Sequence, residues 1–315
     1  MDHAMVVVSG TKIAAELKTS RSEVWRLIRQ LRQSGVEIAG HPATGYQLQA
    51  VPDLLLPDIL GASLRGTIFA GKAQIHHYFK VASTNLVAME AAAAGAPEGS
   101  VFLAEEQTAG RGRGANAWHS VRAAGIYCSV LLRPAVPPSE VLVFLLAAAL
   151  AVRAAVEEVG GITADLKWPN DLMLGEKKFC GILAEMNAEP ARVRHLVIGF
   201  GINVNHASFP DALGQQATSL RLASGSMWSR VELVAALLKS VDREYGALLA
   251  GKNAGESILC RFAEHSSWVR GKSVRVEENG SDLSGVTAGL NDQGFLLVNT
   301  AEGLKTVLSG TVRAR

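Results

Sequence analysis

The stretch from Gln107 to Trp118 has the residue types of an anion-binding loop. Residues 110–114 read Gly-Arg-Gly-Arg-Gly, so glycines alternate with Arg111 and Arg113. Glycine lets a backbone approach a ligand closely, and arginine can make two parallel hydrogen bonds to a carboxylate or a phosphate. The stretch lacks the Gly-Lys-Ser/Thr of a Walker A loop and fits a Rossmann fingerprint poorly. It predicts a loop that binds a carboxylate or phosphate, with a solvated basic loop as the alternative.

A second polar motif, Lys-Trp-Pro-Asn-Asp, occupies residues 167–171. Its proline fixes the chain direction, so the flanking polar side chains can be held rigidly at the end of a strand. Lys178 follows seven residues later and enters an apolar segment. A lysine in such surroundings can neutralise a ligand carboxylate or phosphate. The alternative is that Lys177 and Lys178 are the charged tip of a hairpin.

Residues 197–205 form an apolar strand pattern in which two glycines share one face, and Asn203 and Asn205 continue that face at period two. Small residues make room for a ligand, and amides supply donors and acceptors for a polar ring. A packed core strand is the alternative. The Ser-Thr-Asn at residues 83–85 is a weaker signal, because such a triplet most often begins a helix.

The segments that must position these residues begin with a small N-terminal unit. Residues 10–33 predict two helices, the second of which starts at a capping box of Ser20 and Glu23. Gly35 ends that helix, and residues 36–48 predict a hairpin whose loop contains Gly40, Pro42 and Gly45. Helix, turn, helix and hairpin is the order of a winged helix-turn-helix. Residues 51–66 follow as a linker with one short helix.

From residue 67 to residue 265 the sequence predicts alternating strands and helices. The helices are expected at 88–94, 141–159 and 229–249. After Trp268 the pattern changes to short strands, expected at 273–276, 285–288, 295–298, 306–308 and 311–313 and separated by turns at 279–280, 292–294 and 302–303. A small barrel suits such strands, because closure removes the sheet edges.

The fold class is therefore α+β in three domains. Residues 1–60 are a winged helix-turn-helix plus linker, residues 61–265 a mixed α/β domain, and residues 266–315 a small SH3-like β-barrel. Hydrophobic residues make up 48% and charged residues 19% of 315, which excludes a disordered or fibrous chain. The three cysteines are an odd number without C-x-x-C spacing, which argues against a disulfide framework or a zinc site.

Charge and hydropathy indicate the compartment and the partners. The longest uncharged apolar run, residues 141–152, is too short for a membrane span, and residues 1–8 carry no basic leader. We expect a cytoplasmic protein that does not enter a membrane. The net charge of +2 is concentrated at the N-terminus, where residues 1–49 hold six Lys/Arg against four Asp/Glu. That is where nucleic-acid binding is to be sought.

Taken together, the motifs resemble the biotin protein ligases, and the winged helix resembles that of the bifunctional members that also repress the biotin operon. The resemblance runs from about Ser9 to Arg313. Its carrying motifs are Ser83-Thr84-Asn85, Gln107 with Gly110-Arg111-Gly112-Arg113 and Trp118, Lys167 to Asp171, Lys178 with Gly181-Ile182-Leu183, and Gly201-Ile202-Asn203.

The resemblance implies that biotin is activated with MgATP to biotinyl-5′-AMP and passed to one lysine of a biotin carboxyl carrier protein. The implied biotin-binding residues are Ser83, Thr84, Asn85, Gln107, Arg111, Gly112, Arg113, Lys178, Gly181, Gly199 and Gly201. The implied nucleotide-binding residues are Trp118, Lys167, Asn170, Asp171 and Asn203.

Catalytic roles are implied for three cations. Lys178 would stabilise charge beside the biotin carboxylate and the α-phosphate. Arg111 and Arg113 would neutralise the α-phosphate and close the loop over the reactive anhydride, which water would hydrolyse. Asp171 would hold Mg²⁺ through water or orient Lys178, and the sequence leaves both roles open.

For the N-terminal unit, the resemblance implies a repressor that binds operator DNA as a homodimer when the adenylate is bound. The expected DNA-binding residues lie on the second helix: Arg21, Ser22, Arg26, Arg29 and Arg32. A solvated helix face is the alternative for these arginines.

Two departures from the family pattern stand out. Residues 115–117 read Ala-Asn-Ala, where relatives commonly continue with a second Gly-Arg pair, so retention of the adenylate could be weaker. Residues 1–8 are too few and too β-branched for the three-turn helix expected before Ser9, which leaves a vestigial reader as an alternative.

Two other functions compete with the ligase. One is a lipoate-type ligase of the same fold, which also forms an acyl-adenylate. The other is a DNA-binding regulator that senses biotin without transferring it.

Overall fold

The computed structural model describes residues 6–33, 36–41, 43–50, 53–70, 74–114, 116–251, 253–278 and 281–315. The chain divides into two compact units, Met1–Leu54 and Leu55–Arg315. Some sequence predictions fall outside the described residues: those for residues 1–5, Gly35, Pro42, residues 51–52, Ala115 and the turn at 279–280.

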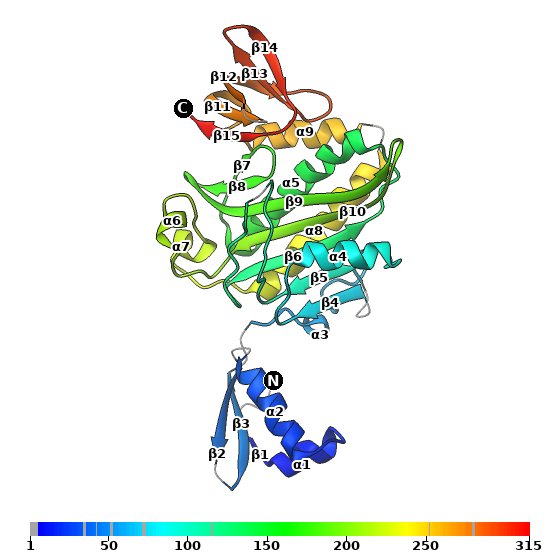
Figure 1. Ribbon diagram of the computed structural model, residues 1–315, viewed down its shortest axis with the longest axis vertical. Helices are drawn as coiled ribbons and strands as arrows, with labels where there is room; N and C mark the ends of the chain where they lie inside the picture. The colour runs from blue at the N-terminus through cyan, green and yellow to red at the C-terminus, as the bar shows by residue number, and fades with distance from the viewer. Residues whose placement is uncertain are drawn as a thin grey trace. The chain divides into compact units, whose positions relative to one another are not determined.

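The first unit has the element order of a winged helix-turn-helix (Figure 1). Its elements are β1 (Val7–Val8), α1 (Gly10–Glu16), α2 (Arg21–Gln33), β2 (Glu37–His41) and β3 (Gly45–Ala50). The strands pair antiparallel in the order β1-β3-β2. The predicted two helices and hairpin are confirmed, and the β-branched Val7 and Val8 form a strand.

A helix cap and a small core explain why this unit folds as it does. The Ser20 hydroxyl accepts a hydrogen bond from the Glu23 backbone N–H at 3.1 Å, which fixes the start of α2. The buried side chains of Ala14, Val24 and Ile28 join the two helices to the hairpin. The opposite face of α2 remains exposed to solvent, and it carries the predicted DNA-binding residues.

The second unit is built on a mixed seven-stranded sheet with the order β4-β5-β6-β10-β9-β8-β7 (Figure 1). Its strands are β4 (Ile75–Tyr78), β5 (Val101–Ala104), β6 (Gly125–Leu132), β7 (Asp165–Lys167), β8 (Asp171–Leu174), β9 (Lys177–Glu189) and β10 (Arg192–Asn203). The β4–β5 pair is parallel and the other pairs are antiparallel. The predicted mixed α/β domain is confirmed.

Helices cover both faces of this sheet. The helices of this unit are α3 (Pro57–Leu60), α4 (Thr84–Ala93), α5 (Val141–Gly160), α6 (Asp211–Gly214), α7 (Leu220–Ser224), α8 (Arg230–Ala250) and α9 (Ala254–Glu264). Helices α5 and α8 pack on one face in the large core, and α4 packs on the other face in a smaller one. On β10, Ile198 and Phe200 face the large core, while Val197 faces α4. The glycines of β10 share the face of Val197, because side chains alternate along a strand.

One helix, Pro138–Gly160, is long and apolar enough to cross a membrane by length and composition alone. Its apolar window is 72% buried inside the structure, against the sheet and α8. A core helix that is apolar on every side has this composition.

A second, antiparallel sheet of five strands follows α9, in the order β14-β13-β12-β11-β15. The strands are β11 (Arg270–Glu278), β12 (Ser281–Leu290), β13 (Leu296–Thr300), β14 (Gly303–Val307) and β15 (Thr311–Ala314). The small C-terminal β domain is confirmed, with strands longer than the predicted ones. Trp168 Nε1 donates to the Gly294 carbonyl at 2.9 Å and joins this sheet to the turn after β7. The division at residues 60 and 265 stays a proposal.

Candidate functional site

A cavity of about 730 Å³ lies on the face of the large sheet that carries α4. Its lining comes from the start of α4, the loop 107–119, the turn between β7 and β8, strands β9 and β10, the loop 209–217 and residues 310–314. Every residue that the sequence analysis assigned to biotin or nucleotide lines this one cavity: Ser83, Thr84, Asn85, Gln107, Arg111, Gly112, Arg113, Trp118, Lys167, Asn170, Asp171, Lys178, Gly181, Gly199, Gly201 and Asn203. The fold brings them together, while their individual roles stay predictions.

The buried polar side chains of Ser83, Thr84 and Asn85 at the start of α4 form one wall of the cavity, called the amide wall after Asn85. Ser83 is the N-cap residue, but its side chain makes no capping hydrogen bond. The Thr84 backbone N–H donates to Gln107 Oε1 at 2.8 Å. This hydrogen bond connects α4 to residues 107–119, called the arginine loop after Arg111 and Arg113. Asn85 Oδ1 accepts a hydrogen bond from Ser129 Oγ at 2.6 Å. These contacts give the wall fixed donor and acceptor directions, as binding of a polar ring requires.

Glycines make the room for this wall and for the indole of Trp118. A Cβ atom on Gly199 would lie 2.0 Å from Asn85 Oδ1, and one on Gly201 would lie 2.5 Å from Trp118 Cε2. A Cβ atom on Gly181 would lie 2.9 Å from the same indole. The sequence interpretation that small residues make room here thus has a specific geometric basis.

The arginine loop is a short hairpin closed by hydrogen bonds. The Trp118 N–H donates to the Gly110 carbonyl at 2.9 Å, and the Gly112 N–H donates to the Asn116 carbonyl at 2.8 Å. Asn116 Nδ2 donates to the Arg113 carbonyl at 3.0 Å. Asn116 therefore closes the turn of this hairpin.

Lys178 is held from several directions. Its Nζ atom lies 2.6 Å from Asp171 Oδ1 and 5.4 Å from the centre of the Trp118 ring. Its backbone N–H donates to the Gln216 carbonyl, and its carbonyl accepts from the Thr218 N–H. Lys178 is therefore a positioned cation, and its ion pair favours orientation of Lys178 as the role of Asp171.

The other predicted nucleotide residues also have defined surroundings. The Lys167 Nζ atom lies 4.2 Å from the centre of the Trp268 ring, and burial lowers the pKa of Lys167 although Asp171 opposes that shift. The side-chain amides of Asn170 and Asn203 donate to backbone carbonyls. Asn203 Oδ1 is buried without a hydrogen-bond partner within the described part of the chain. It is an acceptor that a ligand N–H or O–H can satisfy.

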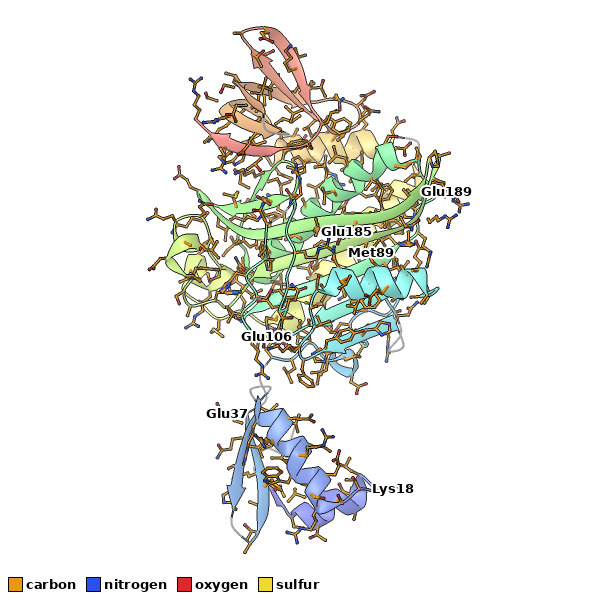
Figure 2. All side chains as sticks on the ribbon, viewed as in Figure 1. Lys18, Glu37, Met89, Glu106, Glu185 and Glu189 are labelled. Atoms are coloured by element: carbon orange, nitrogen blue, oxygen red, sulfur yellow. The ribbon has the colours of Figure 1, made fainter. Side chains whose placement is uncertain are left out.

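Sequence reasoning missed two polar residues behind the cavity wall. Ser129 on β6 contacts both Thr84 and Asn85. Glu185 on β9, labelled in Figure 2, contacts Asn85 and Arg111. Ser129 interrupts the apolar run of β6, and Glu185 follows the apolar segment of β9 at period two from Gly181. That pattern was the signal that could have found them.

The loop 209–217 and residues 310–314 also line the cavity, and no motif marked the first of them. Phe209, Leu213 and Gln215 of the loop contribute side chains to the lining. Arg313 lies in the second segment.

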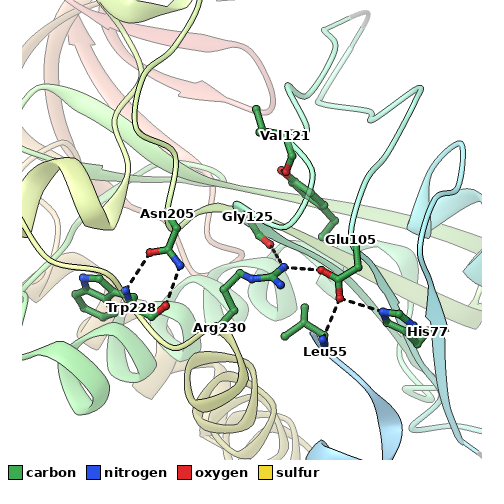
Figure 3. A network of polar contacts seen from close by, with 9 residues as sticks. Leu55, His77, Glu105, Val121, Gly125, Asn205, Trp228 and Arg230 are labelled. Atoms are coloured by element: carbon green, nitrogen blue, oxygen red, sulfur yellow. Dashed lines mark hydrogen bonds and ion pairs between the residues drawn. The ribbon is translucent and has the colours of Figure 1, made fainter. Parts of the chain in front are cut away.

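A buried polar network holds the two ends of the arginine loop together (Figure 3). Arg230 Nη1 donates to Glu105 Oε2 at 2.8 Å and to the Gly125 carbonyl at 3.1 Å. Glu105 Oε1 also accepts from the Leu55 N–H and contacts His77 Nε2 at 3.0 Å. Burial raises the pKa of Glu105, but His77, Arg230 and the Leu55 N–H outweigh it and hold that pKa below its ordinary value. Glu105 precedes the loop and Gly125 follows it, so the network fixes the loop's base.

His206 lies directly behind the cavity lining. Its ring stacks on Phe209 at a centroid distance of 5.2 Å and lies 6.3 Å from the ring of His119, and both of these residues line the cavity. The His206 side chain is buried, and neither of its ring nitrogens has a hydrogen-bond partner among the described residues. Burial, with a smaller effect of His119, lowers the pKa of His206 to about 4.

The neutral state of His206 makes stability depend on pH. Below pH 6.5 the histidine of the unfolded chain binds a proton that the folded chain excludes until about pH 4. From this group we therefore expect the free energy of unfolding to fall by about 2 to 3 kcal/mol between pH 7 and pH 4.5. Urea unfolding at the two pH values should show a smaller loss in His206→Phe than in the wild type. The exposed-site variant His41→Gln should keep the wild-type loss, and an equal loss in His206→Phe would contradict the prediction.

The predicted DNA-binding residues are exposed on α2, but their side chains are not equivalent. The Arg32 guanidinium donates to the Ile38 carbonyl at 2.8 and 3.0 Å, so it supports the hairpin. Arg26 pairs with Glu23 on the same helix. The Arg29 guanidinium lies 5.7 Å from the ring centre of the exposed Trp25. Arg29 is therefore better placed than Arg32 to reach an external ligand.

Three family models match separate segments of the chain. Residues 79–203 match the biotin/lipoate A/B protein ligase family, residues 270–313 match the biotin protein ligase C terminal domain, and residues 4–47 match an HTH domain.

Curated relatives are similar over nearly the whole chain. The bifunctional ligase/repressor BirA of Bacillus subtilis is 36% identical over 307 residues, which cover 97% of this chain and 93% of that protein. The biotin--[acetyl-CoA-carboxylase] ligase of Mycobacterium tuberculosis is 32% identical over 82% of this chain and 97% of its own length. Among solved structures, the biotin protein ligase of Aquifex aeolicus in complex with biotin and ATP matches with a TM-score of 0.67 and 28% identity. That match covers 76% of this chain and 99% of the other.

Proposed function

Because the chain belongs to the biotin protein ligase family, we propose that it activates biotin with ATP and transfers the biotinyl group to a lysine of a biotin carboxyl carrier protein. One observation carries the proposal: a positioned lysine, two arginines and a wall of buried polar side chains beside glycines line a single cavity. Such a cavity suits a ligand with a polar ring at one end and a carboxylate to be activated at the other.

The first step joins biotin to AMP. A biotin carboxylate oxygen attacks the α-phosphorus of ATP, the bond to the β-phosphate bridging oxygen breaks, and pyrophosphate leaves. The ammonium of Lys178 and the guanidinium groups of Arg111 and Arg113 stabilise the negative charge that gathers at the α-phosphate. The arginine loop covers the anhydride and excludes water.

The second step transfers the biotinyl group. The neutral amine of a carrier lysine attacks the acyl carbon, the bond to the phosphate oxygen breaks, AMP leaves, and the amine releases a proton. The enzyme's contribution is to hold the two reacting groups together, which raises their effective concentration.

Ligand contacts are assigned as the sequence resemblance implies. The polar wall from Ser83 to Asn85, with Gln107, binds the ureido ring end of biotin. Trp118, Lys167, Asn170 and Asn203 bind the nucleotide, and Asn203 Oδ1 has an open acceptor position for it. Arg313 lines the same cavity and is a further candidate for a phosphate contact.

Mg²⁺ fits this site as a companion of ATP. The described residues contain no group of three or more His, Cys, Asp and Glu side chains that could cage a metal. Mg²⁺ commonly binds through substrate phosphates and waters with one or two carboxylates, and Asp171 supplies one carboxylate in the lining. When bound, Mg²⁺ neutralises charge on the triphosphate.

A direct experiment separates this proposal from a lipoate-type ligase. The full chain with MgATP should exchange labelled pyrophosphate into ATP when biotin is added and not when lipoate replaces it. Exchange with lipoate alone would overturn the choice of substrate. Exchange with biotin but no labelling of a carrier domain would leave a biotin-sensing regulator.

For the first unit, we propose that it represses transcription in response to biotin. We place the protein in the cytoplasm and expect no membrane partner. Helix α2 would enter the major groove of operator DNA, and two chains would bind two half-sites once adenylate promotes a homodimer. Arg21, Ser22, Arg26 and Arg29 lie exposed on α2 for this purpose. The positive charge of the unit suits a DNA backbone.

Replacing Arg29 should affect operator binding, whereas replacing Arg32 should affect the stability of the first unit. Arg29→Ala should weaken binding of a two-half-site operator about tenfold and leave the melting temperature unchanged, because the Arg29 guanidinium lies against the exposed Trp25 ring on the solvent-facing side of α2. Arg32→Ala should lower the melting temperature of the first unit, because it frees the Ile38 carbonyl.

Gel-shift titrations at fixed salt, with biotin and ATP, measure the first effect. Arg65→Ala removes an equal exposed charge from the second unit and should leave operator affinity unchanged. Equal operator affinity of Arg29→Ala and wild type would contradict a role for Arg29 in DNA binding.

A further inference from the structure

Glu185 stands behind the cavity and contacts both its wall and its covering loop. Its Oε2 atom accepts from Asn85 Nδ2 at 2.9 Å, and its Oε1 atom lies 3.1 Å from Arg111 Nη1. Glu185 itself is absent from the cavity lining, so it acts through these two partners. Figure 2 labels it on the large sheet, and its partner Asn85 belongs to α4.

The contact with Asn85 sets the direction of that amide. A carboxylate can only accept hydrogen bonds, so the amide nitrogen of Asn85 must face Glu185. The same nitrogen donates to the Leu183 carbonyl at 3.3 Å, which leaves Asn85 Oδ1 directed at the Ser129 hydroxyl. Without the negative charge of Glu185, the observed orientation of the Asn85 amide and the flipped orientation would differ less in energy.

The contact with Arg111 holds the arginine loop at the same point. The side chain of Arg111 is half exposed, whereas that of Glu185 is 23% exposed, so the strand provides the fixed end of the pair. Exposed ion pairs contribute about 1 kcal/mol or less, and this pair can change the loop's equilibrium by that amount. The guanidinium keeps further N–H groups for a phosphate.

We propose that Glu185 is a positioning residue that links the amide wall to the arginine loop and thereby slows release of the acyl-adenylate. The proposal rests on the proposed function, because it concerns the intermediate of that reaction. When the adenylate fills the cavity, Asn85 contacts its ureido ring and Arg111 its phosphate, and Glu185 holds both side chains in their binding orientations. Loss of the carboxylate frees the loop to open.

The test is the dissociation rate of biotinyl-adenylate from Glu185→Gln, measured by a chase after a single turnover in the absence of carrier. We expect release about fivefold faster than from the wild type, as loss of about 1 kcal/mol would give. A merely structural role would lower the melting temperature and the number of active sites without changing the rate for sites that formed adenylate.

Two further variants make the result specific. Glu189→Gln removes the same charge from the same strand, where Glu189 pairs with Arg194 away from the cavity, and its release rate should equal that of the wild type (Figure 2). In the double variant Arg111→Ala with Glu185→Gln, the release rate should rise by less than the product of the two single effects, because both changes remove the Arg111–Glu185 contact while only Glu185→Gln also changes the contact with Asn85. Should Glu185→Gln fold poorly, Glu185→Asp retains the charge, and we expect an intermediate rate.

Unchanged release from Glu185→Gln, or multiplied effects in the double variant, would overturn the inference while the ligase proposal stands. Wild-type protein that forms no adenylate from biotin would overturn both.

Discussion

Lys178→Ala is expected to reduce biotin-dependent exchange of pyrophosphate into ATP by about a hundredfold or more, since loss of a fixed cation at a developing charge costs about 3 kcal/mol. The lysine lies in the cavity lining, paired with Asp171 and tied by its backbone to the segment 216–218. The variant removes the ammonium but leaves these backbone hydrogen bonds, so the fold should persist. Exchange rates at saturating biotin and ATP measure the effect.

The neighbouring lysine supplies a matched control. Lys177 is exposed, and its Nζ atom contacts the Gly214 carbonyl at 2.9 Å. Lys177→Ala removes the same charge one residue away and should exchange within about twofold of the wild type, because an exposed contact contributes little. Near-normal exchange of pyrophosphate into ATP by Lys178→Ala would contradict the role assigned to Lys178.

Gly199→Ala should weaken biotin binding about a hundredfold. The added Cβ atom would lie 2.0 Å from Asn85 Oδ1, and Asn85 cannot retreat without breaking its hydrogen bonds to Ser129, Leu183 and Glu185. Each buried hydrogen bond left unmade costs about 1 to 3 kcal/mol. Calorimetric titration of the protein with biotin measures the loss, and the affinity for ATP alone should change less.

A second glycine separates this local clash from a general effect of alanine. Gly246 lies in α8, and a Cβ atom there would have no heavy atom within 4 Å. Gly246→Ala should keep biotin affinity and raise stability by about 0.5 to 1 kcal/mol, because alanine favours a helix interior. Unchanged biotin affinity in Gly199→Ala would show that the amide wall is not part of the biotin site.

Local sequence signals predicted most of the fold because they act over a few residues. Ser20 and Ser229 begin α2 and α8 as N-caps, with hydrogen bonds from the N–H groups of Glu23 and Glu232. The apolar run over residues 141–159 became α5, buried in the core. The C-terminal strands were predicted at the correct positions but with ranges that were too short, because their exposed ends carry polar residues that give no apolar signal.

The sequence predicted the residues that line the candidate cavity but not the residues behind them that hold the lining in place. Gly199 and Gly201 stood out because glycine is costly in a strand and needs a reason. Glu185 and Ser129 did not stand out, because their importance depends on which strand and helix lie beside them. That neighbourhood arises only when β6, β9 and α4 are assembled.

The same limit applies to the helix expected to bind DNA. In sequence, Arg29 and Arg32 look alike as basic residues of one helix. Tertiary structure separates them, because the hairpin places the Ile38 carbonyl beside Arg32 and leaves Arg29 against an exposed indole. A direct DNA contact of Arg32 is therefore less favoured than the sequence indicated.

The most direct test of the central claim is transfer itself. The purified full chain, biotin and MgATP should add a single biotinyl group to one lysine of a biotin carboxyl carrier domain, as seen in the intact mass and in peptide mapping of the carrier. Replacement of that carrier lysine should abolish the mass increase. A carrier that stays unmodified while the chain forms biotinyl-adenylate, or one that receives lipoate and not biotin, would contradict the account.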